Sequence, residues 1–173
     1  MNHFMFRNSW WVKRKRPKIK IELTLFDLII EIAGLVAVLA LWILLMATYS
    51  GLPELIPLQY NALGQVVNFG VKSSIFIFPA IATAIFAGLT ILSRVPHILN
   101  YPVKITENNA FLQYRNAVRM LRYLKLAIVL LSGYIVLHAV LNVGTIGVWF
   151  LPATLGGVLL PVIYFMVRSF MNR

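Results

Sequence analysis

The chain contains no cysteine, and only five of its 173 residues are acidic. The lack of cysteine excludes disulfide bonds, thiolate metal sites and cysteine nucleophiles. The three histidines lie far apart along the sequence, and the serines, histidines and acids together supply no nucleophile, acid–base pair or metal-ligand cluster. We therefore expect no enzymatic activity, no metal ion and no cofactor.

Charged residues are also scarce within four long apolar runs, at about residues 25–49, 74–92, 126–143 and 146–167. Each run is close to the roughly 20 residues that a helix needs to cross about 30 Å of hydrocarbon. Lipid offers no partners to backbone amides, so helices, whose backbone groups pair internally, are expected. The sequence predicts an all-α, polytopic membrane protein with four transmembrane helices.

Positive charge is nearly absent from the connection between the first two runs. Of sixteen lysines and arginines, only Lys72 lies in this loop, residues 50–73, and fifteen lie before, between or after the other runs. The positive-inside rule then places both termini in the cytoplasm and the loop outside. We predict a basic cytoplasmic or interfacial arm over residues 1–24 and a four-helix membrane domain over 25–173, in a bacterial inner membrane.

The net charge of +11 has the same explanation. Basic loops face the anionic lipid head groups of the cytoplasmic leaflet, so the expected partner of this charge is the lipid bilayer. We expect no binding of nucleic acid.

An amphipathic segment, residues 106–125, precedes the third run. Thr106 can cap a helix, and no proline or glycine interrupts the chain before Gly133. We predict that the segment continues into the third span as one helix of about 35 residues, which extends about 50 Å and projects into the cytoplasm. The alternative is a bend that lays the basic part on the membrane surface.

Two acidic residues lie near the start of the first run. Thr24 and Asp27 match the capping-box pattern in its Asp form, and Glu31 follows one turn later on the same face. Acids inside a span are costly, so the pair is a candidate proton or cation site. The alternative, which we favour, is a capped helix end whose acids pair with the basic arm.

A polar stripe along the outer half of the third span is formed by Tyr134, His138 and Asn142, at i, i+4 and i+8. An ionisable residue in a span is a candidate for function. We favour interhelical hydrogen bonding by a neutral His138, because the second to fourth spans hold no acid. Glu54, in the outer loop, is the acid that could reach it.

The outer loop reads Leu-Pro-Glu-Leu-Ile-Pro-Leu-Gln-Tyr-Asn-Ala-Leu-Gly from Leu52 to Gly64 and is followed by Gly70-Val-Lys72. Its prolines and glycines predict a compact series of turns. This motif resembles the signature L-P-x-x-I-P-x-H-[FW]-N-x-x-G-x-x-D-x-[WY]-G-x-K of a bacterial membrane domain family of unknown function. The toxin-immunity protein SdpI carries the same domain, so the resemblance implies a membrane protein of immunity-like type.

The chain departs from this signature at two positions. Gln59 stands where the family usually has histidine, and Val67 stands where it usually has aspartate. A metal or acid–base role of those family residues therefore does not transfer to this chain.

Two functional hypotheses follow. The first is a membrane binding protein whose outer loop recognises a peptide or a membrane partner through Pro57, Gln59, Tyr60, Asn61, Gly64, Gly70 and Lys72. The second is a small transporter or channel component that works as a homo-oligomer, with Glu31, Tyr134, His138 and Asn142 along the polar path.

Overall fold

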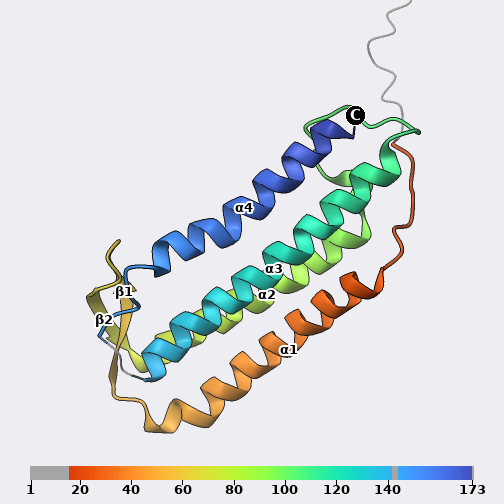
Figure 1. Ribbon diagram of the computed structural model, residues 1–173. Coiled ribbons are helices and arrows are strands. Elements are labelled where there is room, and N and C mark those ends of the chain that lie inside the picture. Colours follow the sequence, from red (N-terminus) through yellow and green to blue (C-terminus); the bar gives the residue numbers. More distant parts are fainter. Residues whose placement is uncertain (1–15, 142–143, 173) are drawn as a thin grey trace, which may run out of the picture.

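The computed structural model describes residues 16–141 and 144–172. Within these residues, four long helices form a bundle with a two-stranded hairpin at one end (Figure 1). The helices are α1 (Leu25–Thr48), α2 (Ile77–Arg94), α3 (Ala110–Val140) and α4 (Phe150–Met171). Short 3-10 helices occupy Tyr49–Gly51, Lys72–Phe76 and Pro96–Ile98. All four helices are long and apolar enough to cross a membrane, so the all-α polytopic prediction is confirmed.

The two ends of the bundle differ in composition. One end carries residues 16–24, the loop between α2 and α3, and the C-terminus, and it is called the basic end below. The other carries the hairpin and the α3–α4 connection, and it is called the hairpin end. Residues 16–24 lead from the basic end of the bundle to α1, and Arg16 donates hydrogen bonds to the carbonyl oxygens of His97 and Leu99.

The start of α1 is fixed by its capping box. The side chain of Thr24 accepts a hydrogen bond from the Asp27 backbone, and the Asp27 carboxylate accepts one from the Thr24 backbone. The predicted capping box is therefore confirmed. Because these contacts occupy amide groups that the helix itself leaves unpaired, they define where the helix begins.

The longest helix is α3, which runs unbroken for 31 residues and spans about 46 Å. The prediction of one continuous helix is confirmed, but the helix is slightly shorter than expected. Thr106 and Asn109 exchange side-chain to backbone hydrogen bonds one turn before Ala110, so the cap opens a short turn rather than the α-helix itself.

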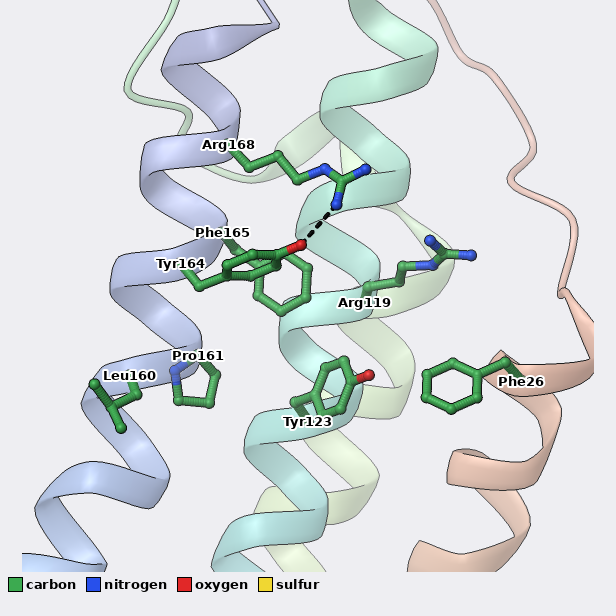
Figure 2. A pocket seen from close by; sticks show the side chains of 8 residues that line it. All are labelled: Phe26, Arg119, Tyr123, Leu160, Pro161, Tyr164, Phe165 and Arg168. Atoms are coloured by element: carbon green, nitrogen blue, oxygen red, sulfur yellow. Dashed lines mark hydrogen bonds between the residues drawn. The ribbon is translucent and has the colours of Figure 1, made fainter.

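Helix α3 is central and packs against the other three helices. Helix α4 buries only Phe165 and Ser169, both near its C-terminal end. Along this part of α4, a cleft of about 440 Å³ opens between α1, α3 and α4, with Arg119 and Arg168 at one end and Leu160 and Pro161 toward the other (Figure 2).

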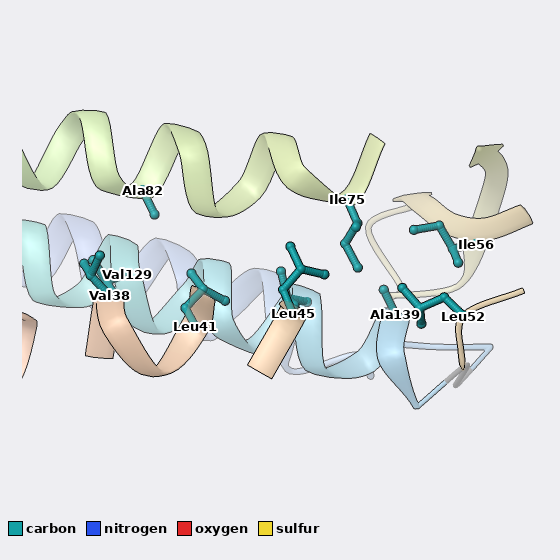
Figure 3. Close-up of a cluster of buried hydrophobic side chains, with 10 residues drawn as sticks. Val38, Leu41, Leu45, Leu52, Ile56, Ile75, Ala82, Val129 and Ala139 are labelled. Atoms are coloured by element: carbon teal, nitrogen blue, oxygen red, sulfur yellow. The ribbon is translucent and has the colours of Figure 1, made fainter. Parts of the chain in front are cut away.

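The apolar core lies between α1, α2 and α3 and reaches into the hairpin (Figure 3). The α1 side chains Leu41 and Leu45 share this core with Val129 and Ala139 of α3, and beyond them Leu52 and Ile56 cover the end of the bundle. Deeper in the bundle, the Trp42 indole donates a hydrogen bond to Thr83 of α2 over 3.0 Å. The outer loop therefore packs on the end of the apolar core and is part of it.

The outer loop is a β-hairpin, whereas the sequence predicted only turns. Strands β1 (Leu55–Tyr60) and β2 (Val66–Val71) pair antiparallel, with register irregularities after Pro57. Pro57 has no amide hydrogen to donate, and prolines in strands are tolerated at edges and bulges. A two-stranded sheet has only edges, so Pro57 is compatible with it.

Candidate functional site

The outer face of the hairpin is apolar and exposed. Because side chains alternate along a strand, Val67, Phe69 and Val71 share one face of β2, and Leu55 lies opposite Val71 on β1. All four side chains are between 56% and 61% exposed. This group, called the outer apolar face below, covers the side of the hairpin that turns away from the core.

The inner face of the hairpin holds it on the bundle. Ile56 is fully buried in the core, and its partner across the ladder is Gly70. A Cβ atom at position 70 would overlap the side chain of Leu58. The absence of a side chain at position 70 thus leaves room for Leu58.

The turn between the strands is organised by Asn61. Its side-chain oxygen accepts hydrogen bonds from the backbone amides of Leu63 and Gln65, at 3.0 and 2.9 Å. Its amide nitrogen donates to the Gln65 side chain. This self-contained network explains why an Asn is present, because its short side chain reaches its own backbone two residues on.

Gly64 connects the turn to the segment between α3 and α4. Its φ is +77°, in the left-handed region that glycine tolerates, and a Cβ atom there would overlap the Gly147 carbonyl. The Gly64 carbonyl oxygen accepts hydrogen bonds from the Ile146 amide and the Thr145 hydroxyl, both at 2.8 Å. The hairpin is therefore tied to the connection between α3 and α4.

The remaining predicted loop residues lie around this framework. Lys72 pairs with Glu54 over 2.8 Å at the base of the hairpin, and Gln59 accepts a long hydrogen bond from Asn68. Pro57 is buried. Burial raises the pKa of the Tyr60 hydroxyl, whose oxygen has no hydrogen-bond partner among the described residues.

The acids of α1 meet cations of α3 at the basic end. Asp27 lies 3.1 Å from Arg119 and 3.2 Å from Arg122. Glu31 lies 3.6 Å from Arg122 and forms a close ion pair with Lys125. Among the described residues, these acids pair with cations of α3 rather than with the basic arm, because α3 extends past the start of α1 and brings its cations to the same depth.

Lys125 joins three helices. Its ammonium group contacts Glu31 of α1, donates to Thr90 of α2 over 2.7 Å, and lies 4.5 Å from the centre of the Phe86 ring. Only 1% of Lys125 is exposed. A buried charge of this kind needs an opposite charge, so Glu31 neutralises Lys125 and holds the first three helices together.

The predicted polar stripe of α3 is partly described. The Tyr134 hydroxyl donates to the Ile146 carbonyl over 2.9 Å, and the Tyr134 ring stacks on Phe150 of α4. His138 Nδ1 lies 3.0 Å from the Tyr134 carbonyl oxygen, within its own helix. Glu54, the acid expected within reach of His138, pairs instead with Lys72. Asn142 lies outside the described residues.

Two groups of residues were not predicted from the sequence. The outer apolar face had a signal in the alternation Val67-x-Phe69-x-Val71, which is typical of a strand. The ion pairs had a signal in their spacing, since the acids four residues apart on α1 match the regularly spaced cations Arg119, Arg122 and Lys125.

Comparisons with known proteins agree with the membrane-domain interpretation. A family model described as "Domain of unknown function (DUF1648)" matches residues 35–83, which run from the middle of α1 through the hairpin into α2. A protein of Archaeoglobus fulgidus named "Uncharacterized protein" is 29% identical over 147 residues, which cover 79% of this chain and 76% of that protein. No solved structure matches. Residues 35–83 are thus similar to a domain of unknown function.

Proposed function

We propose that this integral membrane protein is a recognition protein rather than an enzyme, and that it binds an apolar, extended peptide segment on the outer apolar face of the hairpin. The observation that carries the proposal is the exposure of Leu55, Val67, Phe69 and Val71 on one side of a two-stranded sheet. Contiguous exposed apolar residues mark interaction surfaces in proteins.

The shape of the hairpin suits a peptide. Each strand of a two-stranded sheet has an unpaired edge, and an extended segment can add to such an edge through backbone hydrogen bonds. Alternate side chains of that segment would then pack beside Phe69 and Val67. The resemblance to the family of the immunity protein SdpI supports a peptide or a peptide-like segment of a membrane partner.

The transport hypothesis has weaker support. Glu31 is occupied by Lys125, and the Tyr134 hydroxyl is occupied by the Ile146 carbonyl. These contacts join elements of one protomer instead of lining a polar path. We therefore treat Glu31 and Tyr134 as residues that position helices.

Photo-crosslinking in the native membrane tests the proposal. A photoreactive phenylalanine analogue replaces Phe69, and a control protein carries it at Val148, an exposed residue of the α3–α4 connection. We expect a discrete peptide or protein adduct from position 69 and none from position 148. Val67→Thr should lower the yield from position 69 severalfold, because it removes apolar contact area from the same face.

Two outcomes would refute recognition by the outer apolar face. One is an adduct to lipid alone from position 69, which would make the face a membrane contact. The other is the same adduct from both positions.

The side of the membrane requires a separate experiment. The natural chain has no cysteine, so Leu63→Cys and Asn108→Cys each introduce a single thiol, at the hairpin end and the basic end. Leu63 is a better choice than Asn61, whose side chain holds the turn. We expect an impermeant maleimide added outside to label position 63 only. Labelling of position 108 instead would show that the protein has the opposite orientation.

A further inference from the structure

The cleft between α1, α3 and α4 is amphipathic along its length (Figure 2). Its part nearer the hairpin end is lined by Leu160 and Pro161 of α4 and by Tyr123 of α3. Its part at the basic end is lined by Arg119 and Arg168, which project from facing helices. The cleft thus combines an apolar floor with a cationic end.

A small polar recess adjoins the cationic end. It shares Arg119, Phe165 and Arg168 with the cleft and adds Arg115, so three arginines line one space of about 20 Å³. Among the described residues, neither cavity is lined by a carboxylate. Guanidinium groups bind phosphate oxygens through charge-assisted hydrogen bonds, so a recess lined by arginines and no carboxylate suits an anion.

Two of these arginines carry charge that no carboxylate neutralises within the described part of the chain. Arg115 lies over the Phe111 ring, and Arg168 lies over the Tyr164 ring and donates to its hydroxyl. Arg119 differs, because Asp27 of α1 pairs with it. The recess therefore has a surplus of positive charge.

The depth of the cleft matches that of a lipid. Arg168 directly follows the apolar part of α4, and Leu160 lies eight residues earlier, about 12 Å along the helix axis. The positive-inside rule places this end in the cytoplasmic leaflet, which is rich in anionic lipids. The arginines would then lie at the phosphate level and Leu160 in the hydrocarbon.

We propose that this cleft binds an anionic glycerophospholipid. Its phosphate lies among Arg115, Arg119 and Arg168, whose planar guanidinium groups match phosphate oxygens in pairs. One acyl chain lies along Leu160 and Pro161. The apolar floor favours a lipid over free phosphate, which would use only the recess. This inference does not depend on the role of the hairpin.

Native mass spectrometry of the delipidated full-length protein tests the site with two probes, phosphatidylglycerol and phosphatidylcholine. We expect the protein to prefer the anionic lipid, and Arg115→Gln/Arg168→Gln to weaken its binding about tenfold. The matched control is Arg94→Gln/Lys104→Gln, which removes two cations from the same end of the bundle but from outside both cavities. The control should bind as the wild type does.

A second variant tests the floor independently. Leu160→Trp fills the apolar part and should reduce binding of the anionic lipid severalfold without changing any charge. Equal binding of both lipids by the wild type, or an equal loss in the control variant, would overturn the proposal. So would competition by inorganic phosphate together with unchanged lipid binding by Leu160→Trp, since this would identify a free-phosphate site.

Discussion

The basic end and the hairpin end of the bundle are stabilised by different kinds of interaction. At the basic end, Asp27 and Glu31 pair with cations of α3, and side-chain amides of α3 bond to the backbone of α4. At the hairpin end, apolar side chains such as Leu45 and Ile56 interlock, and the Gly64 backbone docks on the α3–α4 connection. The two ends should therefore respond differently to loss of charge and loss of shape.

The difference follows from the surroundings of each end. Helices gain little from burying apolar surface against each other in lipid, so polar pairs and close packing decide which helices meet. Charged pairs suit the basic end, which carries ten of the eleven lysines and arginines that the structure describes, all except Lys72. At the hairpin end the core continues out of the helices into the strands, where ordinary apolar burial stabilises the fold.

The largest expected effect is at the basic end. Asp27→Asn keeps a side chain able to cap α1 but removes the anion that faces Arg122, which is only 5% exposed. Breaking one partner of a buried ion pair costs about 3 kcal/mol. We expect this loss in the free energy of unfolding, measured by denaturant titration in mixed micelles.

Glu22→Gln is the control, because Glu22 is an exposed acid on the arm. If Asp27→Asn destabilises the protein no more than Glu22→Gln does, then charge does not hold the basic end together.

The hairpin end should be most sensitive to backbone shape. Gly64→Ala introduces a Cβ atom at a φ of +77° and against the Gly147 carbonyl, which together cost about 2 kcal/mol. We expect faster protease cleavage within residues 61–65 and a lower free energy of unfolding. Gly51→Ala is the control, because a Cβ atom there meets open space, and it should change neither quantity. If Gly64→Ala also changes neither, the conformation of this turn does not stabilise the hairpin end.

A smaller effect is expected where the C-terminal end of α4 attaches to α3. The Gln113 side chain donates to the carbonyl oxygens of Ser169 and Asn172, at 2.9 and 2.8 Å. Interhelical hydrogen bonds in membranes contribute about 1 kcal/mol, so Gln113→Leu should loosen the last turns of α4 by about that amount. Hydrogen exchange of the amides near Ser169 measures the change. Gln59→Leu, a control at an exposed position, should leave those amides protected. Equal protection in both variants would show that Gln113 does not hold the end of α4.

The smallest effect is expected for the ion pair at the hairpin end. Lys72 and the exposed Glu54 form a surface contact, which water and salt screen. Lys72→Gln should leave the free energy of unfolding unchanged at physiological salt. A loss comparable to that of Asp27→Asn would show that charge matters equally at both ends.

The helices could be predicted from the sequence because each span is specified by its own residues. The apolar run from Leu25 and the uninterrupted stretch before Gly133 predict α1 and α3 without reference to any neighbour. The pairing of Asp27 with Arg119 could not be predicted in this way. It depends on which helices are adjacent and on how far α3 extends beyond α1, and both are properties of the assembled bundle.

The hairpin was missed for a different reason. Pro57 and the glycines favour turns in a local interpretation, and the apolar alternation of β2 covers only three positions. Its pairing with β1 depends on Ile56 reaching the core and on Gly64 docking on Ile146, contacts that no local pattern contains. The outer apolar face, which carries the proposed function, is a product of that pairing.

The 92-residue separation between Asp27 and Arg119 also has a consequence for biosynthesis. Ribosomes add about 5 to 20 residues per second, so α1 is made about 5 to 20 s before the cations that neutralise its acids. During that interval α1 and α2 have no α3 to pack against. The order of translation therefore makes α3 the helix whose arrival fixes the place of α1 in the membrane.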